Sequence, residues 1–213
     1  MVFEDLLEAI GREPVFETGF LLAGAQNPAY IRRQLADWVR DGKLWQLRRG
    51  LYAPAPPYQK VPPHPFLVAN RLVAGSYVSQ QSALAYYDLI PEYVPAVTSI
   101  TARRPGRWAT PVGEMIFKSL RRDLIFGVDC IQVDAEQVAF VALPEKALLD
   151  LVYLQPGGDD PAYLQSLRLQ NLEQINPERL RALAARWRKP KLVRASQIIL
   201  EMIGDESMAY EAL

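Results

Sequence analysis

Arginine is the side chain whose spacing in this sequence points most clearly to chemistry. Its planar guanidinium donates paired hydrogen bonds to phosphate oxygens and to the edge of guanine, so clustered arginines are typical of proteins that bind nucleic acid. Such a cluster lies near the N-terminus, within residues 27–53. We predict DNA contacts for its basic side chains, which are Arg32, Arg33, Arg40, Lys43, Arg48 and Arg49.

The same stretch carries the signals of a helix followed by a β-hairpin. Asn27 can accept from the free N–H groups of a first turn and Pro28 suits the first helical position, so the helix is expected to begin at Pro28. Apolar residues then recur at three- and four-residue spacing until Gly42, which ends the helix. Two short apolar runs flank the turn Arg48-Arg49-Gly50 and predict a hairpin with arginines at its tip.

A helix with a basic exposed side, joined directly to a basic hairpin, has the layout of a winged helix-turn-helix domain. In that layout the helix enters the major groove of DNA, and the wing reaches the backbone or the adjacent minor groove. Two shorter helices expected within residues 1–24 would complete the domain, which we place at residues 1–57. The alternative interpretation is an ordinary helical hairpin whose basic side is only solvated.

The charge distribution favours a nucleic-acid partner, although the net charge does not. The chain holds 24 Lys and Arg against 24 Asp and Glu. Most of the basic residues fall in three groups, at residues 27–60, 103–122 and 178–194, where acidic residues are few. Because phosphates respond to the local field, a neutral protein with segregated charge can still present a basic face.

A second domain is expected beyond a proline-rich linker, which we place at residues 58–65. Residues 66–213 alternate helical segments with strand-like runs rich in Val, Ile and Phe, and predict a small antiparallel or mixed sheet with a helical tail. The fold class of the whole chain is therefore expected to be α+β. Off the end of one predicted strand, Arg103, Arg104 and Arg107 form a second candidate site for phosphate or an acidic partner; a solvated loop is the alternative.

The sequence contains no recognisable catalytic or metal-binding motif, so we expect no enzyme, no metal and no cofactor. One cysteine and one histidine cannot form a zinc site. Gly157-Gly158 lacks the Lys and Ser/Thr of a phosphate-binding loop, and Asp160 is interpreted as the cap of a following helix. The residues Lys146 and Asp150 are interpreted as a surface ion pair on a helix. Without a signal peptide, a disulfide framework or a membrane-length apolar run, the protein is expected to be cytoplasmic.

Several motifs taken together resemble the AbiEi family of antitoxins, in the same order and across nearly the whole chain. This resemblance implies an N-terminal winged-helix domain that represses its own operon by binding promoter repeats, and a C-terminal domain with antitoxin activity in a type IV toxin-antitoxin system. It also implies a nucleotidyltransferase-like toxin that the antitoxin counteracts without a stable complex. The motifs are GKLWQLRRGLY at 42–52, YVSQQSAL at 77–84, LIPE at 89–92, SITARRP at 99–105 and LPEKALLD at 143–150.

Two functions from other classes remain open at this point. The chain could be a protein-interaction module whose helix and hairpin bind protein, in which case no salt-dependent affinity for DNA is expected. It could also be a metal-dependent enzyme that processes nucleic acid, although no divalent-metal site can be built from these residues. Promoter repeats would call for two copies on DNA, which monomers or a dimer could supply.

Overall fold

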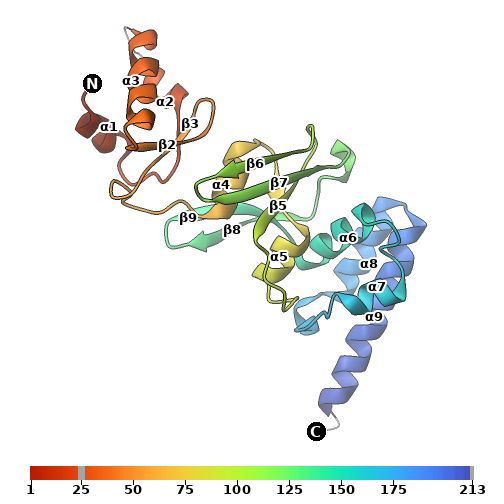
Figure 1. Ribbon diagram of the computed structural model, residues 1–213. Coiled ribbons are helices and arrows are strands. Elements are labelled where there is room, and N and C mark those ends of the chain that lie inside the picture. The colour runs from red at the N-terminus through yellow and green to blue at the C-terminus, as the bar shows by residue number, and fades with distance from the viewer. Residues whose placement is uncertain (24–26, 212–213) are drawn as a thin grey trace.

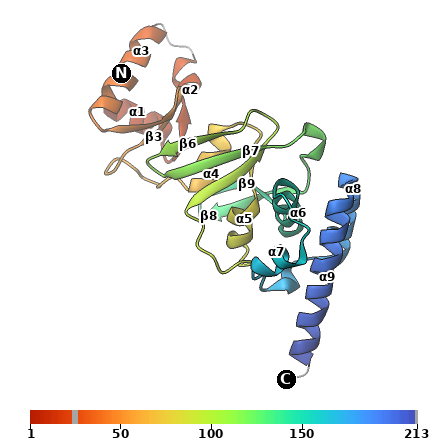
Figure 2. The same ribbon diagram turned by 45° about the vertical axis from the view of Figure 1, so that its right-hand side comes forward.

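The computed structural model describes residues 1–23 and 27–211, with side chains up to residue 205. This part of the chain combines helices with two β-sheets, so the predicted α+β class is correct. A small module stands at the N-terminal end, a larger sheet lies in the middle, and helices gather at the C-terminal end, from which the last helix projects (Figures 1 and 2). None of the described helices is long and apolar enough to cross a membrane.

The N-terminal module, residues 1–54, has its own small core. It comprises α1 (Phe3–Ile10), β1 (Phe16–Glu17), α2 (Thr18–Leu22), α3 (Pro28–Arg40), β2 (Leu44–Arg48) and β3 (Leu51–Pro54). The three strands pair antiparallel in the order β1-β3-β2, and the two-residue strand β1 was not foreseen. Leu6, Leu35 and Leu44 are almost fully buried between the helices and this sheet.

The predicted boundaries of α3 are confirmed. The side-chain oxygen of Asn27 accepts from the Tyr30 N–H at 3.1 Å, and Pro28 is the first helical residue. Gly42 follows the helix with a φ of 70°, a left-handed conformation that a side chain would strain. The chain can therefore reverse at once into the hairpin.

A six-stranded mixed sheet forms the middle of the molecule, in the order β6-β7-β5-β4-β9-β8. Parallel pairing joins β5 to β7 and β4 to β9, whereas the other neighbours are antiparallel. The sequence predicted β5, β7, β8 and β9. It did not predict β4 or β6, and the first residues of β6 were expected in a turn after a strand. Their bounds are β4 Tyr77–Val78, β5 Ala96–Thr101, β6 Gly106–Thr110, β7 Gly113–Ser119, β8 Val128–Asp134 and β9 Gln137–Ala142.

Helices pack around this sheet and continue beyond it. The helix α6 (Pro144–Leu154) is largely buried between the sheet and the C-terminal helices, so that even its charged residues Glu145, Lys146 and Asp150 have no exposed surface. The remaining elements are α4 (Pro65–Leu72), α5 (Gln80–Tyr86), η1 (Arg122–Leu124), α7 (Pro161–Ser166), η2 (Leu172–Gln174), α8 (Pro177–Trp187) and α9 (Pro190–Glu211).

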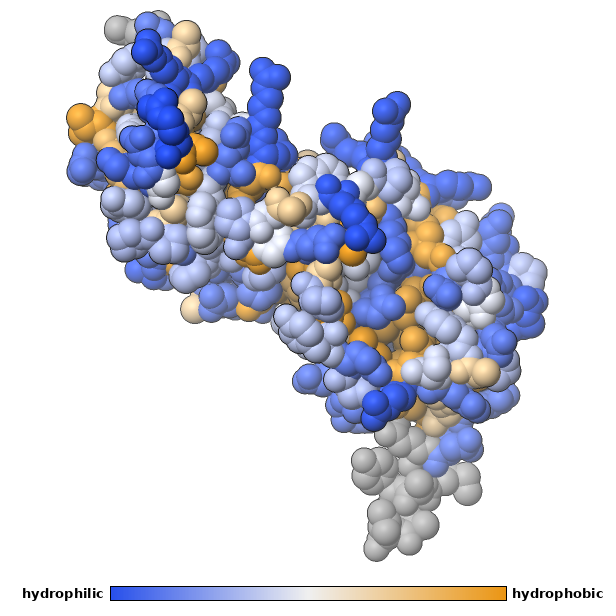
Figure 3. Space-filling model, in the orientation of Figure 1, coloured by the Kyte–Doolittle hydropathy of each residue, from blue (hydrophilic) through white to orange (hydrophobic). Residues whose placement is uncertain are grey.

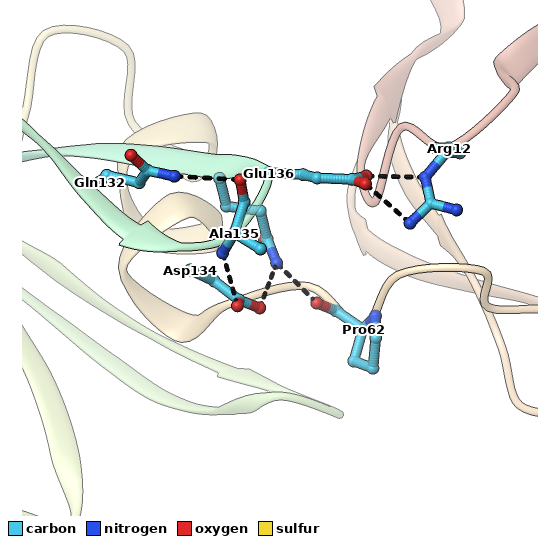
Figure 4. Close-up of polar contacts among 7 residues, drawn as sticks. Arg12, Pro62, Gln132, Asp134, Ala135 and Glu136 are labelled. Atoms are coloured by element: carbon cyan, nitrogen blue, oxygen red, sulfur yellow. Dashed lines mark hydrogen bonds and ion pairs between the residues drawn. The ribbon is translucent and has the colours of Figure 1, made fainter.

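The N-terminal module packs directly on the rest of the chain. Leu47 and Leu51 of the hairpin belong to the same apolar cluster as Leu72 of α4. At the surface of this junction, the Arg12 guanidinium makes two contacts with the Glu136 carboxylate, at 2.7 and 2.8 Å (Figure 4). The two parts therefore contact each other through both apolar and charged groups.

The proline-rich segment between the two parts is tied to the end of the β8–β9 hairpin. The Gln137 side chain, which is 2% exposed, accepts from the His64 N–H at 2.7 Å and donates to the Pro62 carbonyl at 2.9 Å. His64 in turn caps α4, because its Nδ1 accepts from the Phe66 N–H at 3.1 Å. The Gln137 amide thus supplies hydrogen-bond partners to two backbone groups of a segment that forms no regular strand.

Candidate nucleic-acid interface

The exposed side of α3 carries the first group of candidate residues. Arg32, Arg33 and Arg40 are all exposed, whereas Leu35 and Trp38 on the opposite side are 0% and 8% exposed. The predicted separation of a basic side from an apolar side is therefore confirmed. On the face drawn in Figure 3, hydrophilic side chains project over α3 and over the adjacent hairpin.

Arg32 and Arg49 line the same hollow. Its volume is about 720 Å³, and it opens between α2, α3 and the hairpin turn. The turn is held there because the Thr18 N–H donates to the Gly50 carbonyl at 2.9 Å, and Gly50 adopts a φ of 81°. Gln46 supplies an amide to the same hollow. Two guanidiniums and an amide thus face one concave, open surface.

The two candidates near the end of α3, Arg40 and Lys43, are held by contacts within the protein. Arg40 contacts Asp37 at 2.8 Å and Asp41 at 3.8 Å, so its charge is partly neutralised. Lys43 is half-buried, and its Nζ lies 5.0 Å from the centre of the Phe3 ring. A cation over an aromatic face is stabilised within the protein. Both side chains would have to leave these contacts to reach a phosphate.

Arg48 points away from the hollow that contains Arg49. Its guanidinium donates to the Glu17 carboxylate and to the Arg71 carbonyl, each at 3.3 Å, and its side chain is 33% exposed. Instead it lines a separate cleft of about 490 Å³ together with Arg103 and Arg104. The adjacent arginines of the hairpin therefore serve different surfaces.

The structure divides the three arginines of the second candidate site in the same way. Arg103 and Arg104 precede β6 and line the cleft with Arg48. Arg107 lies within β6, where it pairs with Glu114 of β7 at 3.1 Å and does not line the cleft. The sequence predicted that all three arginines lie together off the end of a strand, whereas the pairing of β6 with β7 holds Arg107 apart from the other two.

A buried ionic cluster lies on α6, where the sequence predicted only an exposed ion pair. Lys146 and Asp150 do form an ion pair one helical turn apart on α6, but both are 0% exposed, so the prediction of a surface pair was wrong. The Asp150 carboxylate also accepts from the Ser79 hydroxyl at 2.7 Å and the Tyr77 hydroxyl at 2.9 Å. These hydroxyls come from β4 and the start of α5, so the cluster joins α6 to the sheet.

Burial shifts the pKa values of Lys146 and Asp150 in opposite directions. Burial lowers the pKa of the Lys146 ammonium, while the neighbouring Asp150 charge works to raise it. Burial likewise raises the pKa of the Asp150 carboxyl, and the contacts with Lys146 and the two hydroxyls partly oppose that rise. Burial and the adjacent carboxylate together raise the pKa of Tyr77, which keeps its proton as a donor.

Aromatic rings surround the lysine. The Lys146 Nζ lies 4.5 Å from the centre of the Trp187 ring and 5.1 Å from that of Phe126. Such contacts stabilise a desolvated cation. The arrangement explains how a lysine can be enclosed at the junction of α6 and α8. No helical periodicity could have revealed it, because an i, i+4 Lys–Asp pair is also common on exposed helices.

The acidic stretch before α7 has a structural role. Asp160 accepts from the Ala162 N–H at 2.9 Å, which confirms the predicted helix cap. The neighbouring Asp159 binds the Arg194 guanidinium at 2.7 Å, and this bond lowers the pKa of its carboxyl. Among the described residues, no group of three His, Cys, Asp or Glu side chains is placed to hold a metal ion.

Comparison with known proteins shows similarity of fold. No protein-family model and no curated protein matches the sequence. Among solved structures, the chain is similar to that of the RV2827C protein from Mycobacterium tuberculosis, with a TM-score of 0.56 and 18% sequence identity. The match covers 92% of this chain and 75% of the other. This architecture, including both the N-terminal module and the larger sheet, is therefore one that a mycobacterial protein shares.

Proposed function

We propose that the protein is a sequence-specific DNA-binding autorepressor whose larger domain acts as an antitoxin. The observation that carries the DNA-binding part is the hollow lined by Arg32 of α3 and Arg49 of the β2–β3 turn. The element order α1-β1-α2-α3-β2-β3 and the exposed arginines of α3 support a winged helix-turn-helix interpretation of the N-terminal module.

In this proposal α3 enters the major groove and the β2–β3 turn is the wing. Arg33, which is exposed and makes no ion pair among the described residues, is the side chain best placed to bind a base edge. Arg49 at the wing tip binds the phosphate backbone, which holds the helix in register without reading sequence. Arg32, which lines the hollow together with Arg49, can serve either role, whereas Arg40 and Lys43 contribute less because of their internal contacts.

The test is a fluorescence-anisotropy titration of the full chain with its own upstream DNA and with a scrambled duplex, at several salt concentrations. Tighter binding to the native duplex is expected, with log affinity falling linearly against log salt by about 0.9 per phosphate contact. Equal, salt-independent behaviour on both duplexes would instead favour a protein-interaction module.

Single substitutions separate the two kinds of DNA contact. Arg49→Gln should weaken both duplexes alike and reduce the salt slope by about one contact, whereas Arg33→Gln should lower mainly the preference for the native sequence, by roughly 1–3 kcal/mol. The matched control is Arg181→Gln, which removes an exposed charge from α8, far along the chain. If the control weakens binding as much as the other two, the assignment of the interface is wrong.

The antitoxin part of the proposal rests on the resemblance to the AbiEi family. We place the antitoxin activity in the domain that follows the linker. This domain would counteract a nucleotidyltransferase-like toxin without forming a stable complex with it. Co-expression with the toxin of the same operon tests it. The double variant Arg33→Gln/Arg49→Gln should still restore growth while losing repression of its promoter. Loss of both activities together would contradict a division of labour between the domains.

A further inference from the structure

The cleft that contains Arg48, Arg103 and Arg104 concentrates three positive charges, of which only that of Arg48 has an acidic partner, Glu17, among the described residues. It lies between the hairpin of the N-terminal module and the loop that leads into β6. No acidic side chain lines it. Within the described part of the chain, the guanidiniums of Arg103 and Arg104 make no hydrogen bond or ion pair. Such a surface attracts an anion.

Arg48 brings a second, independent sign of a missing ligand. Although two of its nitrogens donate to protein oxygens, its Nε is buried and has no acceptor among the described residues. A buried N–H without a partner costs free energy, so the internal contacts of Arg48 leave part of its guanidinium unsatisfied. The carboxylate of Glu17 lies on one side of this guanidinium only, at 3.3 Å.

An aromatic ring stands beside the three arginines. Trp108 lines the cleft and is held edge-on against Phe117, with ring centres 4.9 Å apart. Gly106 lies close to the same ring, since a Cβ at that position would come within 2.9 Å of it. The indole is thus fixed in position and remains partly exposed. Indole faces stack on nucleobases.

The cleft also continues past Arg103. A neighbouring hollow of about 340 Å³ shares Ala74 and Arg103 with it and adds Arg122, while the first hollow measures about 490 Å³. Small-molecule sites typically span about 300–1,000 Å³, which matches this pair. A chain of phosphates can therefore extend from the first hollow towards Arg122.

We propose that this cleft binds a nucleoside triphosphate, with its base against Trp108 and its phosphates on Arg48, Arg103 and Arg104. The arginines supply charge-assisted donors for the phosphate oxygens, and the ring supplies a stacking face. This site is distinct from the Arg32–Arg49 hollow and does not depend on the proposed binding of DNA. Arg48 belongs to β2, so the ligand would contact the strand that leads to the hairpin turn.

Isothermal titration calorimetry of the full chain with ATP, inorganic tripolyphosphate and adenosine tests each half of the site. We expect ATP to bind more tightly than tripolyphosphate, and adenosine to bind most weakly. Arg103→Gln/Arg104→Gln should weaken ATP binding by roughly tenfold or more, because it removes charge-assisted hydrogen bonds. Trp108→Leu should weaken ATP binding but leave tripolyphosphate binding unchanged.

The control Arg107→Gln/Arg181→Gln removes the same total charge from exposed positions outside the cleft and should leave ATP affinity as in the wild type. Thermal unfolding of each variant identifies loss of structure. Failure of the wild type to bind ATP would overturn the proposal, as would unchanged ATP affinity in Arg103→Gln/Arg104→Gln.

A titration with duplex DNA shows whether the cleft binds the phosphates of a free nucleotide or those of the DNA backbone. If the wild type binds duplex but not ATP, and Arg103→Gln/Arg104→Gln weakens duplex binding, the cleft belongs to the DNA interface and the proposal is wrong. If ATP binding follows the expected pattern while specific DNA binding is absent, the nucleotide site stands and the proposed repressor function fails.

Discussion

Replacing the buried lysine by methionine should reveal what its charge contributes to folding. In Lys146→Met the Asp150 carboxylate keeps the hydroxyl donors of Tyr77 and Ser79 but loses its only cation partner in the described structure. Methionine is close to lysine in length and flexibility, so the surrounding aromatic rings retain a packing partner. The variant therefore tests mainly the charge, with little change in volume.

The size of the effect follows from the burial of both groups, which are 0% exposed. Removing one member of a buried ion pair typically costs about 3–5 kcal/mol. Protonation of Asp150 limits the loss to about 4 kcal/mol at pH 7, because the ordinary pKa of Asp, about 3.9, lies about three units lower and each unit is worth about 1.4 kcal/mol. We therefore expect Lys146→Met to lower the free energy of unfolding by roughly 3–4 kcal/mol at pH 7.

The pH dependence of this variant has a definite sign. Without Lys146, burial raises the pKa of Asp150 with less opposition, so the folded state binds a proton more readily than the unfolded state. The free energy of unfolding of Lys146→Met should consequently increase as the pH is lowered from 7 towards 5. In Lys146→Met/Asp150→Asn this gain should disappear, and the double variant should lose less stability than the two single losses combined.

Urea unfolding followed by circular dichroism at pH 7, 6 and 5 measures these quantities for the wild type, Lys146→Met, Asp150→Asn and the double variant. An exposed pair, Arg121→Met in the Arg121–Asp123 contact, provides the control, and its stability should change little. A loss below about 1 kcal/mol in Lys146→Met, with additive effects in the double variant, would refute the burial argument.

Three further predictions concern other contacts. Burial lowers the pKa of His64, so wild-type stability should fall as the pH drops below about 6.5, and His64→Asn, which keeps a capping oxygen, should lose much of that dependence in urea unfolding at pH 7 and 5. Gly158→Ala should lower the free energy of unfolding, measured by urea denaturation, by about 1–3 kcal/mol, because the new Cβ would clash with the Val152 carbonyl oxygen. The exposed pair between Arg12 and Glu136 should contribute little to stability, so a double-mutant cycle with glutamine at both positions should give a small coupling energy that salt reduces.

Local signals in the sequence were enough to predict the helix ends. Asn27-Pro28 and Asp160-Pro161 each predicted a capped start, and in both cases the side-chain oxygen accepts from the first turn. Such signals act within a few residues, so they do not depend on the rest of the fold. The alternation of Val, Ile and Phe likewise located most strands of the larger sheet.

What could not be predicted depends on contacts between distant segments. The strand β1 is two residues long and exists only because Phe16 and Glu17 pair with β3, thirty-odd positions away in the chain. The burial of Lys146 depends on Trp187 and Tyr77, which come from a later helix and an earlier strand. Neither helical periodicity nor local propensity carries information about such partners.

The two arginines of the hairpin illustrate why the candidate site was only partly predictable. In a regular strand, Gln46 and a residue two positions later would point to the same face. The register shifts between these positions, however, so that Gln46 opposes Tyr52 while Arg48 opposes Leu51. Because Tyr52 and Leu51 point to opposite faces, the bulge directs Arg48 away from Gln46 and Arg49. One extra residue in β2 thus divides a continuous basic motif between two clefts, and no pattern within the motif itself records that division.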